Sequence, residues 1–132
     1  DMMIKNLRSS ALAFLLVTSP STGAENDAGR ELIADSADHF FFAMDKRRSQ
    51  RNEFVYAWIS QIPKSDDNLY RETKIYYRIQ CREQRVLTLA EIIYGPKNKV
   101  VSSQRVDDNP YVEGSYVAPG TIGEAIYEWA CV

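Results

Sequence analysis

The stretch Thr73–Cys81, with the sequence TKIYYRIQC, alternates between apolar and polar side chains more cleanly than any other part of the chain. In an extended conformation, one face carries Ile75, Tyr77, Ile79 and Cys81 and the other carries Lys74, Tyr76, Arg78 and Gln80. A period of two residues is typical of a β-strand that lays one face on a core. The pattern therefore predicts a strand in which the side chain of Cys81 points inward.

Apolar runs separated by polar turns predict further strands on both sides of this stretch. They are His39–Asp45, Glu53–Ile62, Gln84–Tyr94 and Val100–Val106. Lys46–Asn52 would form the turn of a first hairpin, and a slip in the alternation of Gln84–Tyr94 indicates a β-bulge. We expect a single antiparallel sheet of about five to six strands.

The end of the chain changes to a helical period. Thr121 and Glu124 form the Thr-x-x-Glu pattern of a capping box, in which each side chain accepts a hydrogen bond from the backbone N–H of the other residue. Apolar residues then recur at helical spacing, at Ile122, Ala125, Ile126, Trp129 and Ala130. We expect an α+β domain with a C-terminal helix of roughly ten residues, held on the sheet by packing because so short a helix is marginal alone.

The chain has two cysteines, Cys81 in the best-patterned strand and Cys131 at the end of the expected helix. In an exported protein such a pair is expected to form a disulfide. The bond would close a loop of about 51 residues and contribute on the order of 4 kcal/mol to stability. Two buried free thiols are the alternative. The prediction is a disulfide that fastens the C-terminal helix to a strand.

Residues 1–24 follow the order of a secretory signal peptide. Its three parts are a charged part with Lys5 and Arg8, an apolar part at Ala11–Val17, and small residues at Ser19–Ala24. Met2 or Met3 is the expected start, so Asp1 is expected to take no part in the fold. The apolar part is far shorter than the ~20 residues that span a bilayer, so we expect no integral membrane segment after signal removal. An amphipathic or buried N-terminal helix is the alternative.

Cleavage after Ala24 would leave a polar leader at residues 25–38 and a folded domain at residues 39–132. We expect the leader to be flexible, with at most a helical turn around Arg30–Ala34. No cysteine lies near the cleavage point, so a lipid-anchored N-terminus is not expected. The protein would be exported, to the periplasm, the cell surface or the medium.

The residues for catalysis or cofactor binding are sparse. With 16 basic and 18 acidic residues the net charge is −2, which is the wrong sign for a dedicated nucleic-acid binder. His39 is the single histidine, and Gly-x-Ser-x-Gly and Gly-rich phosphate motifs are absent from the sequence. One histidine and two paired cysteines do not make a zinc site. The spacing of oxygen ligands in a calcium loop is absent from Asp66–Asp67 and Asp107–Asp108, which indicate solvated loops instead. We expect no enzyme, no metal and no cofactor.

Binding has more support than catalysis. Four cations, Lys46, Arg47, Arg48 and Arg51, fall in one predicted turn. They could meet a sulfated glycan, lipid headgroups or an acidic protein, or could simply be a solvated hairpin turn. Tyr111 and Tyr116 are candidate interface residues or half-buried sheet residues, and Glu113–Tyr116 is a candidate protruding loop of an enzyme inhibitor. A free sheet edge would permit a homodimer.

The order of several segments forms a wider pattern. It comprises the run HFFFAMD at 39–45, a basic turn, a strand with Trp58, the motif Lys74-x-x-Tyr77-x-x-x-Cys81, and the closing PGTIGEA at 119–125 followed by Cys131. This order resembles the bacterial surface-adhesin protein E family over roughly residues 39–131. The resemblance implies a single antiparallel sheet with a stapled C-terminal helix, export, and binding of host matrix and serum proteins. We expect a non-enzymatic binding protein with a protein or glycan partner; a periplasmic assembly factor and a small exported enzyme inhibitor are the alternatives.

Overall fold

The structure is a computed structural model that describes residues 30–51, 53–66 and 69–132. The chain divides into two units, Asp1–Glu31 and Leu32–Val132, and the second contains the helix and nearly all of the sheet. The predicted signal segment at residues 1–24 and the first residues of the predicted leader, 25–29, lie outside the described residues.

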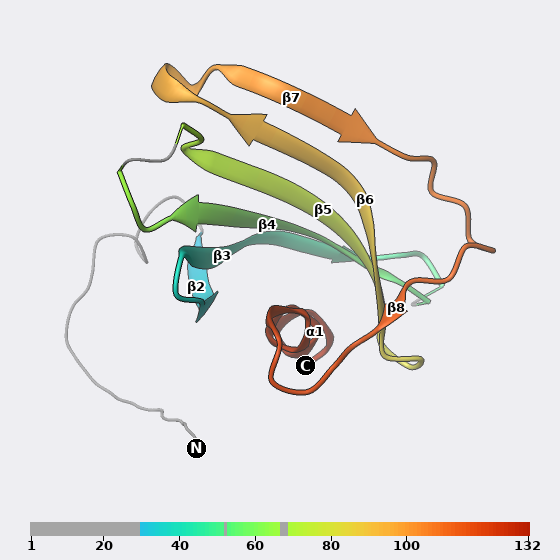
Figure 1. The fold of residues 1–132 in the computed structure, drawn as a ribbon. Coiled ribbons are helices and arrows are strands. Elements are labelled where there is room, and N and C mark those ends of the chain that lie inside the picture. The colour runs from blue at the N-terminus through green and yellow to red at the C-terminus, as the bar shows by residue number, and fades with distance from the viewer. Residues whose placement is uncertain (1–29, 52, 67–68) are drawn as a thin grey trace. The chain divides into compact units, whose positions relative to one another are not determined.

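Seven strands and one α-helix are found in the described ranges. The strands are β2 (Glu31–Asp35), β3 (His39–Arg48), β4 (Val55–Pro63), β5 (Glu72–Gln80), β6 (Arg85–Tyr94), β7 (Val100–Arg105) and β8 (Ser115–Tyr116). The first six are neighbours in chain order, and β8 pairs with the start of β6. The pairs from β3 onward are antiparallel, and the sheet curves around α1 (Ile122–Cys131) (Figure 1). The predicted α+β fold is confirmed, with β2 and β8 as strands that the sequence patterns did not indicate.

Strand β2 corrects the prediction of a loose leader with at most a helical turn. Its residues Ile33 and Ala34 pack against the hydrophobic core. A tight turn follows, in which Ser36 N–H donates to the carbonyl of His39 at 2.9 Å and the Ser36 hydroxyl accepts from His39 N–H at 3.1 Å. Pairing with β3 therefore selects an extended conformation for a short segment whose own sequence pattern does not indicate a strand.

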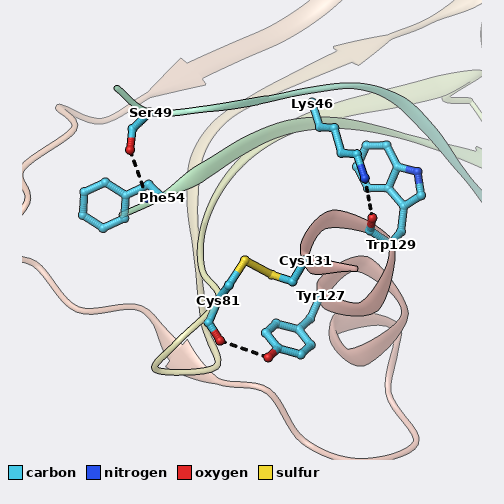
Figure 2. The surroundings of a disulfide bond; sticks show 7 residues. All are labelled: Lys46, Ser49, Phe54, Cys81, Tyr127, Trp129 and Cys131. Carbon is cyan, nitrogen blue, oxygen red and sulfur yellow. Dashed lines mark hydrogen bonds between the residues drawn. A yellow bond between two sulfur atoms is a disulfide. The ribbon is translucent and has the colours of Figure 1, made fainter. Parts of the chain in front are cut away.

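The first hairpin is longer than its sequence pattern indicates. β3 continues to Arg48 instead of ending at Asp45. The sequence pattern does not show this continuation, because an extra residue between Ala43 and Asp45 shifts the register and hides the alternation. The turn begins at Ser49, whose N–H donates to the carbonyl of Phe54 at 2.9 Å and whose hydroxyl accepts from Phe54 N–H at 3.1 Å (Figure 2). Lys46, Arg47 and Arg48 therefore belong to a strand and not to a turn.

Strand β5 has the alternation that TKIYYRIQC predicts. Ile75 and Ile79 are buried on the side of α1, next to Ile59 and Val55 of β4. The bulge predicted in β6 is confirmed, since the register shifts between Tyr76 and Tyr77 and leaves one extra residue in β6. Bulges of this kind bend a sheet, which is consistent with the curvature around the helix.

Helix α1 forms as its spacing predicts. Ile126 and Ala130 are buried against the core, and the Thr121 hydroxyl accepts from Glu124 N–H at 3.3 Å. The Glu124 carboxylate accepts from Gly120 N–H at 2.9 Å, one residue before the partner of a standard capping box. Gly120 has a φ of +76°, a conformation that suits glycine and lets its N–H turn toward that carboxylate.

The Cys81–Cys131 disulfide is present, which confirms the predicted link between a strand and the helix. It joins the residue after β5 to the last residue of α1 (Figure 2). The Tyr127 hydroxyl donates to the Cys81 carbonyl at 2.9 Å beside the bond. The C-terminal helix is thus held by apolar packing, one covalent bond and one side-chain hydrogen bond.

Candidate partner-binding site

The face of the sheet that points away from α1 carries one unusually buried cation. Arg78 of β5 lies opposite Tyr56 of β4, one residue along from the buried Val55–Ile79 pair that faces the helix. Side chains of neighbouring strand residues point to opposite faces. Arg78 and Tyr56 therefore reach the face away from α1, where the sequence pattern predicts solvent.

Arg78 is only 1% exposed, because the segment after β7 folds back over it. Its Nη1 donates to Asp108 Oδ1 at 2.8 Å and to the Asn109 carbonyl at 2.9 Å, and its Nη2 donates to the Val112 carbonyl. The guanidinium lies 4.6 Å from the centre of the Phe54 ring. Its Nε is buried without a hydrogen-bond partner among the described residues. One guanidinium thus holds three successive points of a single loop.

Asp108 connects this loop to the sheet a second time. Its Oδ2 accepts from the Tyr56 hydroxyl at 2.6 Å. Partial burial favours the neutral acid, but the hydrogen bonds from Tyr56 and Arg78 and the charges of Arg78 and Arg47 outweigh it and lower the pKa of Asp108. Burial, followed by the hydrogen bond to Asp108 and its charge, raises the pKa of Tyr56 to about 12. Asp108 is therefore ionised at neutral pH, and the loop predicted to be solvated is an anchored one.

The anchored loop presents Tyr111 to solvent on a fixed turn. Val112 N–H donates to the Asn109 carbonyl at 3.0 Å, which closes a four-residue β-turn with Pro110 and Tyr111 in its centre. The Asn109 side chain accepts from Tyr111 N–H at 2.9 Å. Arg78 holds the carbonyls at both ends of this turn, yet Tyr111 itself is 91% exposed. A turn anchored by hydrogen bonds at both ends thus carries an exposed aromatic ring.

The segment after this turn is fixed as well, which corrects the prediction that Glu113–Tyr116 protrudes. A Cβ on Gly114 would lie 2.5 Å from the Val86 carbonyl oxygen, so the backbone there approaches β6 as closely as only glycine allows. Arg85 Nη1 donates to the Gly114 carbonyl at 2.7 Å, and the Arg85 guanidinium lies 3.7 Å from the centre of the Tyr116 ring. The protruding element is the turn at Pro110 and Tyr111.

The four predicted cations do not form one cluster. Lys46 points to the helix side, where its ammonium donates to the Trp129 carbonyl at 2.7 Å and lies 4.8 Å from the centre of the Trp129 ring (Figure 2). Arg47 points to the opposite face, over the ring of Tyr56. Because these residues lie in a strand, successive side chains alternate between faces. Arg48 and Arg51 are both exposed, the first at the end of β3 and the second in the turn that follows.

Arg78, Asp108 and Tyr56 are site residues that the sequence reading missed. The clean alternation of β5 assigns Arg78 to a solvated face, and Asp107–Asp108 resembles an ordinary polar loop. Two sequence features could have indicated the site if they had been considered together: an arginine in a strand with apolar neighbours, and an Asp-Asp-Asn-Pro loop rich in hydrogen-bond acceptors. Each feature is common by itself, and nothing in the sequence indicates that the loop returns across β5.

His39 lies at the start of β3, with its ring 6.2 Å from that of Phe41. In the part of the chain that the structure describes, no group of three or more His, Cys, Asp or Glu residues is placed to hold a metal ion. None of the described helices has both the length and the apolar character needed to cross a membrane.

Comparisons with known proteins find no family model, no curated protein and no solved structure that matches this chain. The resemblance to the surface-adhesin protein E family therefore stays an expectation from sequence.

Proposed function

We propose that this protein is an exported, non-enzymatic binding protein that engages a partner protein through Tyr111. The observation that carries the proposal is the combination of a 91% exposed tyrosine with a turn held by a fully buried arginine. Tyrosine is enriched among the residues that dominate protein interfaces. A turn that is already ordered loses little conformational entropy on binding, so more of the contact energy appears as affinity.

Export is part of the proposal and rests on two observations. The first 24 residues have the order of a signal peptide, and Cys81 and Cys131 form a disulfide, which persists in oxidising compartments. The sheet, the C-terminal helix and the disulfide also match what the resemblance to surface-adhesin protein E implies, and that family suggests host matrix or serum proteins as partners. Fractionation of the producing cells would separate a surface location from a soluble periplasmic pool.

A small enzyme inhibitor is the second candidate, and the fixed turn is the observation that favours it. Inhibitors that fill an enzyme's active site commonly present a loop whose backbone moves little on binding. Assays of lysozyme and of secreted proteases with the protein in excess test this candidate. Inhibition that is lost in Tyr111→Ala would assign the turn to an enzyme partner.

The main test is capture of host matrix and serum proteins on the immobilised protein, followed by measurement of affinity for each captured partner. Tyr111→Ala is expected to weaken the affinity by about 30-fold, as for a residue that contributes about 2 kcal/mol at an interface. Tyr116→Ala is the matched control, since Tyr116 is also exposed but lies on Arg85 away from the turn. Equal affinity of the wild type and Tyr111→Ala for every captured partner would contradict the proposal.

A further inference from the structure

Exposed arginines surround one end of the sheet, where β3 ends, β4 begins and β5 ends. We name the set Arg47, Arg48, Arg51 and Arg82 the basic band. Three of its members belong to the predicted basic segment, and Arg82 joins them from the turn after β5. The band combines residues more than thirty positions apart in sequence, so the fold and not the local sequence assembles it.

The basic band lines three adjoining depressions of the surface. One, of about 310 Å³, is bordered by Arg47 and Arg48, and the next, of about 530 Å³, by Arg47 and Arg51. The third, of about 400 Å³, is bordered by Arg51 and Arg82. The first depression is also bordered by Val55 and Ala130 and lies on the helix side, whereas the other two lie on the opposite face. Arg47 borders the first two and Arg51 the last two, so the cations follow one another around the end of β3 from one face to the other. A path of shallow depressions suits an extended ligand better than a compact one.

The charges along this path are mainly positive. Arg48, Arg51 and Arg82 form no ion pair with another described residue. Asp108 borders the middle depression, but Arg78 and Tyr56 already bind its carboxylate. Glu53 and Glu83 are the remaining acidic residues that line the three depressions, against four arginines. A protein with a net charge of −2 thus gathers positive charge at one end.

Arg47 is oriented before any ligand arrives. Its guanidinium lies 4.7 Å from the centre of the Tyr56 ring, and its Nη2 donates to the Tyr76 hydroxyl at 3.4 Å. These two contacts use one face and one N–H of the guanidinium, and an arginine has five N–H donors. The remaining donors can meet two oxygens of one anionic group side by side, as guanidinium groups do with carboxylate and phosphate.

We propose that the basic band binds a linear sulfated glycan. Sulfate groups spaced along a chain would meet successive arginines across the three depressions, and they stay ionised at every physiological pH. This site adjoins the Tyr111 turn, since Pro110 borders its third depression, but it uses different side chains and extends the function beyond protein binding. Its attraction is electrostatic and exposed to solvent, so the affinity falls as salt rises.

The test measures binding of a sulfated hexasaccharide to the full chain by calorimetry at low and at physiological salt. The double variant Arg51→Ser and Arg82→Ser is expected to bind about tenfold more weakly, since two charge-assisted contacts are lost. Arg105→Ser, an exposed arginine on β7 outside the band, is the matched control and should bind as the wild type does. Tyr111→Ala should also leave glycan binding unchanged, so this site and the proposed protein site fail or succeed separately.

Three outcomes would overturn the proposal. The double variant could bind the sulfated hexasaccharide as tightly as the wild type does. The same hexasaccharide without sulfate could bind equally well, which would remove the charge argument. Polyglutamate of similar length could bind as tightly, which would assign the band to acidic polypeptides. The near-ultraviolet circular dichroism of each variant, compared with the wild type, ensures that a loss of binding is not a loss of fold.

Discussion

The two faces of the sheet are covered in different ways. On one face, α1 is held by the burial of Ile126 and Ala130 and by the Cys81–Cys131 bond. On the other, the segment after β7 is held by directed side-chain hydrogen bonds, chiefly those of the Arg78 guanidinium, with further bonds from Tyr56 and Arg85. Apolar contact is non-directional and tolerates small shifts, whereas hydrogen bonds fix the positions of particular backbone atoms. The first arrangement supplies stability, and the second supplies the geometry of the exposed turn.

The largest effect is expected on the helix side. Replacing both cysteines, Cys81→Ser with Cys131→Ser, should lower the free energy of unfolding by on the order of 4 kcal/mol, because the unfolded chain regains the freedom of a closed loop. Denaturant unfolding followed by tryptophan fluorescence measures the change, and Trp129 lies on the helix concerned. A loss below about 1 kcal/mol would mean that packing alone holds α1.

A smaller loss of stability, with a larger loss of local order, is expected on the other face. Arg78→Met should lower the free energy of unfolding by about 2–3 kcal/mol, because charge-assisted hydrogen bonds to Asp108 and to two carbonyls are lost. NMR relaxation of the Tyr111 amide should show its order parameter falling from about 0.85 to below about 0.6.

The matched control for this substitution is Arg105→Met, which removes an exposed arginine from β7. It should change the free energy of unfolding by less than about 0.5 kcal/mol and leave the order parameter of the Tyr111 amide unchanged. An ordered Tyr111 amide in Arg78→Met would show that the turn is rigid without the buried arginine, and the contrast between the two faces would disappear.

The smallest effect is expected from Tyr56→Phe, which removes one hydrogen bond of about 1 kcal/mol and keeps the ring. The pKa of Tyr56 is raised from 10.0 to about 12, so the folded protein favours the neutral phenol. This preference stabilises the fold in full below pH 10, and the stabilisation is lost as pH rises through about 12. The pKa of Tyr77 is also raised to about 12, by burial and then by the charge of Glu91. Ultraviolet titration should therefore show one late tyrosine fewer in Tyr56→Phe. Loss of a tyrosine that titrates near the ordinary 10.0, in place of a late one, would contradict the Tyr56–Asp108 bond.

Acidification tests the ion pair between Arg78 and Asp108. The pKa of Asp108 is lowered on folding, so its contribution to stability is present above its unfolded pKa and is lost as pH falls through the folded value. In Arg78→Met much of this dependence should vanish, because the main charged partner is gone. Unfolding measured across the acid range for the two proteins gives the comparison.

The helix side of the molecule follows from the sequence because its signals are local. The spacing of Ile126 and Ala130, the cap at Thr121 and the alternation that points Cys81 inward each depend on a few neighbouring residues. Strand β2 and the end of β3 were missed for a physical reason. The first depends on pairing with a distant strand, and in the second a bulge after Ala43 shifts the period of two.

The candidate site is less predictable because it depends on one long-range return of the chain. The sequence predicts Tyr111 as a candidate, but nothing near it in sequence indicates that its turn is anchored. The anchoring hydrogen bonds come from Arg78, more than thirty residues earlier, and from Tyr56 before that. The predicted grouping of the four cations was wrong in detail because of local structure. When a run of like charges lies in a strand, successive side chains point to opposite faces of the sheet.

The disulfide has one further consequence, for limited proteolysis. Residues 81–131 form a covalently closed ring, and the exposed turn at Pro110 and Tyr111 lies within it. A single cut in that turn would open the ring without releasing a fragment, so nicked protein would keep its full mass until a reductant is added. One cleavage would thus detach Tyr111 from one of the two carbonyls that Arg78 holds, those of Asn109 and Val112. The sheet and the helix would stay joined by the disulfide.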